Sequence, residues 1–144
     1  MTIDFGYGVV MDNVEFKLDA AKYVLDNFAT QEILDEFNEF RKYNDDITDD
    51  DEAKEIFVDE YEDPIYCEGG ICGLLVRCIN AHECGESHKF AYEDYCIYVG
   101  ARIPADDDEK SGMLTMDDIR KILAKYLNPI LKNNVNVEFL EIHD

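Results

Sequence analysis

The sequence predicts an α+β fold, in which helices pack on an antiparallel sheet of about four strands in the order β-ααα-β-β-α-β. Two patterns indicate this class: runs rich in β-branched and aromatic residues lie at both ends and in the middle of the chain, and segments with helical apolar spacing lie between them. The 144 residues, 47% of them hydrophobic, are typical of one folded domain. We expect a single domain over 1–144, with a Cys/His-rich insertion at about 64–90.

The N-terminal half is predicted to contain one strand followed by three helices. Residues 2–11 favour a strand, and apolar residues at helical spacing predict a helix over about 18–28. Thr30 is a suitable N-cap for a second helix. A third helix is expected after Thr48, with Asp49–Glu52 in its first turn, where the helix dipole favours anions.

The middle of the chain is predicted to be β-structure. Residues 65–72 predict a hairpin closed by a Gly69-Gly70 turn. Residues 71–81 are expected to continue as a strand, because Gly69, Gly70 and Gly73 disfavour the helix that the spacing of the apolar residues would also allow. Another strand is predicted over 92–103.

The C-terminal part is predicted to be a helix and a last strand. Thr115 and Asp118 resemble a capping box, and Pro129 ends the helix that follows. A final or edge strand is expected over about 135–142. The apolar stripe of the helix consists of Ile119, Ile122, Leu123, Tyr126 and Leu127.

Acidic residues dominate the charge of the chain: 34 Asp and Glu against 13 Lys and Arg give a formal charge of −21. Direct binding to nucleic acid or to an anionic membrane is not expected, because both require Lys and Arg. A charge of this size destabilises the folded state by self-repulsion, which a basic partner would relieve. The excess is concentrated in residues 32–63, where fifteen acids and three bases give a net charge of −12.

Two segments within 32–63 form a candidate partner-binding surface. Four carboxylates on the second helix recur at helical spacing, about 5–6 Å apart at Cβ, a distance comparable with that between successive phosphates of a nucleic acid. Such an array fits a basic groove, although a solvated acidic face serves solubility equally well. The surface consists of Glu32, Asp35, Glu36, Glu39, Asp45, Asp46, Asp49, Asp50, Asp51 and Glu52.

Seven cysteines and histidines within thirty residues indicate a structural zinc site, since zinc takes four such ligands. One arrangement uses the local series Cys78, His82, Cys84 and His88, with the first three on one face of a strand. The other places Cys67 across the hairpin from Cys72, with Cys84 and His88 completing the site. Cys84 and His88 belong to both arrangements.

No catalytic motif is present, and we expect no enzyme activity. The run 82–88 is not the H-E-x-x-H of zinc proteases, and no phosphate-binding loop or serine nucleophile motif is found. The segment 107–118 resembles an EF-hand loop, with Asp107 and Gly112 at the expected positions, but Asp118 is short for the bidentate ligand. A capped helix is favoured there, with a calcium loop as the alternative.

The location is expected to be the cytoplasm. The first residues have no basic n-region or long apolar stretch, so they do not resemble a signal peptide, and no run approaches the length of a membrane span. Five cysteines in such a chain indicate thiols or metal ligands rather than a disulfide framework. For a phage-encoded protein, the location would be the cytoplasm of the bacterial host.

In overall character, the chain resembles the small acidic inhibitors of phages and mobile elements, which include DNA-mimic antirestriction proteins and anti-CRISPR proteins. The resemblance rests on the acidic stretches Glu32–Glu39, Asp45–Glu52 and Asp59–Asp63 and includes no diagnostic motif. At least one kind of type II anti-CRISPR protein contains zinc, which the Cys67–His88 segment would suit. Such inhibitors block the loading of guide or target nucleic acid.

The resemblance implies a non-enzymatic inhibitor that binds a type II CRISPR effector nuclease through its acidic surface. Reversing the four acids of the second helix to Lys is expected to abolish inhibition while leaving the fold intact. One alternative is a DNA mimic that inhibits a restriction, repair or transcription protein. Another is a small metal-binding enzyme or regulatory module.

Overall fold

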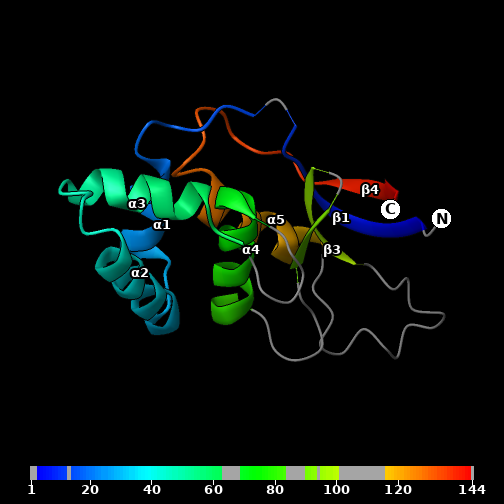
Figure 1. Ribbon diagram of the computed structural model, residues 1–144. Helices are drawn as coiled ribbons and strands as arrows, with labels where there is room; N and C mark the ends of the chain where they lie inside the picture. The colour runs from blue at the N-terminus through cyan, green and yellow to red at the C-terminus, as the bar shows by residue number, and fades with distance from the viewer. Residues whose placement is uncertain are drawn as a thin grey trace.

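Figure 1 shows the fold as a computed structural model, in which residues 3–12, 14–62, 69–83, 90–93, 95–100 and 116–143 are described. The predicted α+β class is confirmed, because these residues form five helices and a four-stranded antiparallel sheet. In the described part of the chain, four helices rather than three lie between the first two strands. The elements are β1 (Ile3–Val10), α1 (Ala20–Asn27), α2 (Gln31–Tyr43), α3 (Asp50–Asp59), α4 (Gly70–Glu83), β2 (Phe90–Glu93), β3 (Cys96–Gly100), α5 (Met116–Leu127) and β4 (Glu138–His143).

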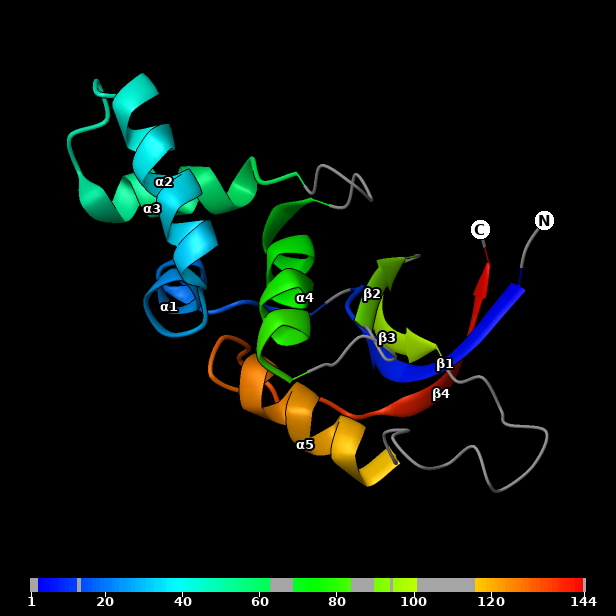
Figure 2. The same cartoon turned by 90° about the horizontal axis from the view of Figure 1, so that it is seen from below.

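The sheet has the strand order β2-β3-β1-β4, so the first strand of the chain lies in its interior. β1 pairs with β3 from Gly6↔Gly100 to Val10↔Cys96, and with β4 from Ile3↔His143 to Gly8↔Glu138. Helix α4 packs on β2, α5 packs on β1, and α3 packs on α4. Figures 1 and 2 show α4 and α5 between the sheet and the group formed by α1, α2 and α3.

The helices of the N-terminal half form where the sequence predicts them. The Thr30 hydroxyl accepts a hydrogen bond from the Ile33 N–H (3.3 Å), and the Asp49 carboxylate accepts one from the Asp51 N–H (3.0 Å). These caps satisfy backbone donors that the first turn of a helix leaves without partners. Ile33 of α2 and Phe57 of α3 are buried in the common core.

The predicted hairpin at 65–72 and strand over 71–81 are wrong where the structure describes them, because Gly70–Glu83 is helix α4. Gly70 has a φ of 69° and its N–H donates to Tyr61 O at 2.8 Å, so its left-handed conformation starts a helix instead of closing a hairpin. A Cβ on Gly69 would lie 2.7 Å from that same oxygen. Both glycines therefore allow the backbone conformation and the close contact with Tyr61 at the start of α4.

Helix α4 lies at the centre of the molecule and is apolar on most of its circumference. A helix buried on several sides gives a nearly continuous apolar run, which periodicity alone does not distinguish from a buried strand. Its buried residues are Cys72, Gly73, Leu74, Leu75, Val76, Cys78 and Ile79.

The predicted strand over 92–103 overlaps the last residues of β2 and the whole of β3. These two strands form a hairpin, pairing antiparallel from Phe90↔Val99 to Glu93↔Cys96. Tyr95, between the two strands, has a φ of 59°. The predicted C-terminal helix and last strand are confirmed as α5 and β4, and α5 buries Ile119 and Leu123 of its predicted stripe. The proposed cap Thr115 and the loop before it lie outside the described residues.

Candidate functional site

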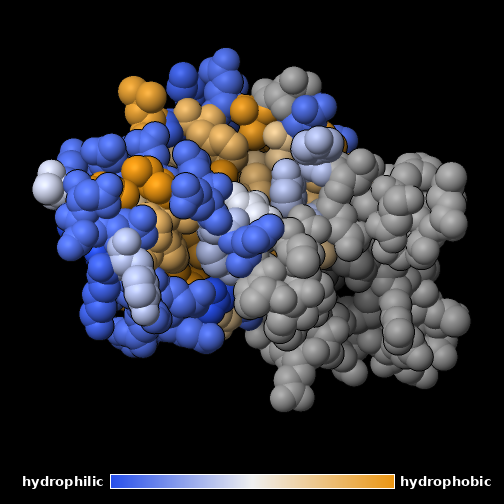
Figure 3. Space-filling model, viewed as in Figure 1, coloured by the Kyte–Doolittle hydropathy of each residue, from blue (hydrophilic) through white to orange (hydrophobic). Residues whose placement is uncertain are grey.

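The acids of the candidate partner-binding surface lie on α2, on α3 and on the turn between them. All are exposed except Glu36, which is half-buried. Figure 3 shows hydrophilic side chains over most of the surface of these helices in this view, with hydrophobic side chains between them. The described cations pair with some of these carboxylates and leave others without an ion pair, so the ten acids are not equivalent.

Arg77 of α4 neutralises one end of the acidic face of α2. Its guanidinium lies 3.1 Å from a Glu32 oxygen and 2.6 Å from the buried Oε2 of Glu36, and it donates to the Tyr61 hydroxyl at 3.3 Å. The hydrogen bond to Glu36 raises the pKa of Arg77, because it favours the charged form. Glu32 and Glu36 therefore hold α2 against α4. Reversing them, as the test suggested by the sequence requires, would disturb the fold.

The first turn of α3 is neutralised by neighbouring cations. Asp50 contacts Arg41 at 2.6 Å and Lys54 at 3.1 Å, and Asp51 contacts Lys22 at 3.3 Å. The hydrogen bond from Lys54 lowers the pKa of Asp50, which keeps this carboxylate ionised. Each of these exposed ion pairs contributes little to stability, but together they reduce the negative charge that α3 presents to a partner.

The C-terminal end of α2 carries carboxylates that no cation neutralises among the described residues. Glu39, Asp45 and Asp46 are exposed and have no ion pair there. Asp45 and Asp46 follow the helix end, where the dipole is negative and disfavours anions. Tyr43, with 80% of its surface exposed, lies beside them in the chain. We call Glu39, Tyr43, Asp45 and Asp46 the α2-end patch.

Two further acids of the predicted surface, Asp35 and Glu52, also have no ion pair among the described residues. Asp35 accepts a hydrogen bond from Gln31 at 2.9 Å, and Glu52 lies in the first turn of α3, where the helix dipole favours an anion. Asp49 serves as the N-cap of α3. Each has a local role that the acids of the α2-end patch lack, so the patch is the part of the surface most available to a partner.

The geometry expected for the zinc ligands is wrong in its strand-based parts. Cys78 and His82 lie on helix α4 rather than on a strand, and Cys72 lies in the first turn of that helix rather than opposite Cys67 in a hairpin. Cys67, Cys84 and His88 lie outside the described residues. Within the part of the chain that is described, no group of three or more metal-binding side chains is present.

The two described cysteines of α4 pack in the hydrophobic core. Cys78 is fully buried, and burial raises its thiol pKa to about 12. Burial likewise raises the pKa of Cys72 to about 11. In the absence of a metal ion, both environments therefore favour the protonated thiol.

The C-terminal end of α4 is tied to α1 and α5 by polar contacts. His82 Nε2 lies 2.7 Å from Phe28 O, so this nitrogen already has a partner. Glu83 accepts hydrogen bonds from Lys125 (2.6 Å) and from the Tyr126 hydroxyl (3.0 Å). The Lys125 hydrogen bond lowers the pKa of Glu83. Glu83 thus has a structural role in a segment where the sequence indicated metal chemistry.

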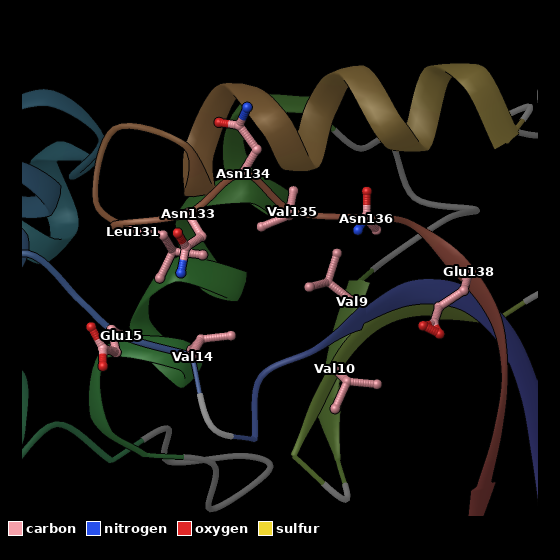
Figure 4. A pocket seen from close by; sticks show the side chains of 10 residues that line it. All are labelled: Val9, Val10, Val14, Glu15, Leu131, Asn133, Asn134, Val135, Asn136 and Glu138. Atoms are coloured by element: carbon pink, nitrogen blue, oxygen red, sulfur yellow. The ribbon is translucent and has the colours of Figure 1, made fainter.

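A cavity of about 250 Å³ that the sequence analysis did not anticipate lies beside β1 and β4 (Figure 4). Its walls come from the end of β1, from residues 14–15 and from the segment 131–138. The sequence offers no clear signal for this cavity, because the three asparagines of residues 132–138 are equally typical of a loop. The candidate calcium loop, residues 107–118, lies outside the described residues up to residue 115.

Comparison with protein-family models, with curated proteins and with solved structures finds no match to this chain. Its candidate sites are therefore interpreted from their own chemistry. Among the described helices, none combines the length and the apolar character needed to cross a bilayer.

Proposed function

We propose that this protein is a non-enzymatic inhibitor that binds a basic nucleic-acid-binding protein and blocks the loading of nucleic acid. The α2-end patch supports the proposal, because it presents three exposed carboxylates that no described cation neutralises, together with an exposed tyrosine. Tyrosine is enriched in the energetically dominant parts of protein interfaces. The proposed target is a type II CRISPR effector nuclease.

The charge of the chain gives this interaction a physical driving force. Self-repulsion within a chain of net charge −21 is relieved when a Lys/Arg-lined surface approaches the carboxylates. Complementary charge also accelerates association and makes it sensitive to salt. We therefore expect binding to weaken as ionic strength rises, since the Debye length falls from about 10 Å at 0.1 M to about 3 Å at 1 M.

Reversing two acids of the patch tests the proposal. Asp45→Lys with Asp46→Lys is expected to weaken binding to the target at least about tenfold, because two attractive contacts become repulsive. Both residues are exposed and lie between helices, so the melting temperature should change little. Binding is measured by surface plasmon resonance, and inhibition by a nuclease assay.

The matched control is Asp19→Lys with Glu62→Lys, which changes the net charge by the same amount at exposed positions outside α2 and α3 that have no ion pair among the described residues. This variant should bind within about threefold of the original protein, since most surface charges away from an interface contribute little. Equal weakening by both pairs would show that only total charge matters and would contradict a localised docking surface.

The identity of the target is tested by capture from bacterial lysates, with the Asp45→Lys/Asp46→Lys variant as the negative control. Specific retention of a CRISPR effector nuclease supports the proposed target. Retention of a restriction, repair or transcription protein instead would support the same mode of inhibition with that protein as the target. A gain of catalytic activity on addition of metal would favour the alternative of a small metal-binding enzyme.

We also propose structural zinc in the segment around Cys84 and His88, held without Cys78. The exclusion of Cys78 is supported by its packing, because its side chain is fully buried in the hydrophobic core. We expect elemental analysis to find the same zinc content in the Cys78→Ala variant as in the original protein, and less in Cys84→Ala. Loss of zinc from folded Cys78→Ala, or absence of zinc from the original protein, would contradict this proposal.

A further inference from the structure

The cavity beside β1 and β4 forms because two paired segments separate and then meet again. The β1–β4 ladder ends at Gly8↔Glu138, and the same two parts of the chain pair again at Phe16↔Leu131. This second contact includes the hydrogen bond from Lys132 N–H to Glu15 O (3.0 Å). Between the two contacts, residues 9–12 and 14 do not pair with residues 133–137, and the cavity opens in this split.

The main chain of β1 faces the split at Val10. Met11 N–H donates to Tyr95 O at 2.6 Å, on the β3 side of the strand. Since backbone groups alternate in direction along a strand, those of Val10 face the β4 side. Continuation of the register would place Val10 opposite Asn136, but the ladder ends two residues earlier. The cavity therefore has polar backbone groups at its wall.

The side chains around the cavity combine aliphatic walls with amides and carboxylates (Figure 4). Among the residues that the structure describes, no lysine or arginine lines it. Glu15 lies 3.6 Å from Lys132, whereas Glu138 has no ion pair in the described ranges. The aliphatic residues are Val9, Val10, Val14, Leu131 and Val135, and the polar residues are Glu15, Asn133, Asn134, Asn136 and Glu138.

This chemistry matches a ligand with an aliphatic stem and a cationic, hydrogen-bonding head. Amide oxygens and a carboxylate accept hydrogen bonds, and the planar guanidinium of arginine carries five donors on such a stem. The volume of about 250 Å³ is below the roughly 300–1,000 Å³ of typical small-molecule sites. It thus suits one side chain better than a nucleotide or a large cofactor.

We propose that this cavity binds the guanidinium group of an arginine side chain from a protein partner. The source of the arginine rests on the proposed function, since a nucleic-acid-binding protein presents basic side chains at its surface. The stem lies against the valines, and the head lies between Glu138 and the asparagine amides. The cavity supplies a second, geometrically specific contact beyond the charge attraction of the α2-end patch.

The test is an NMR titration of the full chain with n-butylguanidinium, with the neutral isostere n-butylurea as the reference ligand. We expect saturable shifts of the amides of Val9, Val135 and Asn136, with a dissociation constant on the order of millimolar for so small a ligand. n-Butylurea should bind at least about fivefold more weakly, because it lacks the charge. Shifts that do not saturate, or equal binding of the two ligands, would overturn the proposal.

Two variants with the same change in net charge separate this site from general attraction of cations. Glu138→Gln should weaken n-butylguanidinium binding at least about fivefold. Glu55→Gln, at an exposed position on α3, should leave it unchanged. Equal weakening by both variants would mean that only the net charge of the protein matters, and it would overturn the proposed arginine site.

A capped Gly-Arg-Gly peptide tests the source of the guanidinium. Binding at least as tight as that of n-butylguanidinium supports an arginine side chain of a protein, whereas exclusion of the peptide would overturn that source. The result is independent of the α2-end patch. If lysate capture finds no nucleic-acid-binding target while the peptide still saturates the cavity, the proposed function fails and the arginine site stands.

Discussion

Leu74→Ala and Leu75→Ala are each expected to lower the free energy of unfolding by about 2–5 kcal/mol, the usual range for removing a buried leucine side chain. Both side chains are 0% exposed in α4, and both belong to the core that joins the helices to the sheet. Each substitution removes apolar contacts and leaves a cavity at the centre of the molecule. Chemical denaturation followed by circular dichroism measures the effect.

The pair of substitutions also distinguishes a helix from the strand that the sequence favoured. Adjacent side chains of a strand point to opposite faces, so in a half-exposed strand one of the two leucines would reach solvent and its loss would cost little. Ala81→Ser, at an exposed position of the same helix, is the control and should change stability by less than about 0.5 kcal/mol. A small effect for either leucine would contradict the central helix.

Arg77→Met is expected to cost about 2–3 kcal/mol and to loosen α2 from α4. Removing one partner of a buried ion pair typically costs about 3–5 kcal/mol, because the other charge is left uncompensated. The expected value is lower here, since the Glu36 side chain is 42% exposed and part of its charge stays hydrated. The measurement is the denaturant midpoint at unchanged slope.

A double variant tests whether the orphaned carboxylate causes this loss. Arg77→Met with Glu36→Gln should be more stable than Arg77→Met alone, because the uncompensated charge has been removed. Lys42→Met is the control for loss of one positive charge, since Lys42 is exposed and has no ion pair among the described residues. Equal stability of Lys42→Met and Arg77→Met would show that the Arg77 contacts contribute nothing specific.

Local signals were sufficient to predict the helices of the N-terminal half and α5. Thr30 and Asp49–Glu52 mark helix starts through side-chain caps and the helix dipole, both of which act within one turn. The stripe containing Ile119 and Leu123 is amphipathic because one side of α5 faces solvent. The structure of such helices is determined by residues close together in the sequence, so it can be predicted from short segments.

Helix α4 could not be predicted in this way, because its glycines are explained only by a contact with another part of the chain. Gly70 is needed for its positive φ and for the hydrogen bond to Tyr61, nine residues earlier in the sequence. The close approach of Gly69 to the same carbonyl has no local signature. Tertiary contact thus overrides the apparent preference for a turn.

The candidate site was predictable in composition but not in arrangement. The acidic stretch over residues 32–63 is visible in the sequence, whereas the pairing of Glu32 and Glu36 with Arg77 joins residues more than forty positions apart. The split that opens the cavity likewise depends on pairing between β1 and β4. Charge distribution is a property of the chain, but the carboxylates left available to a partner depend on the fold.

The interior position of β1 determines when the sheet can be completed during synthesis. β1 is synthesised before both of its neighbours in the sheet, β3 and β4, and β4 extends to residue 143. Contacts at such sequence separation form slowly, and an unpaired strand edge is prone to aggregation until they do. The acidic segment, residues 32–63, is synthesised before β3 and β4, while β1 is still unpaired. We expect its net charge of −12 to oppose association between nascent chains during that interval, because like-charged chains repel one another.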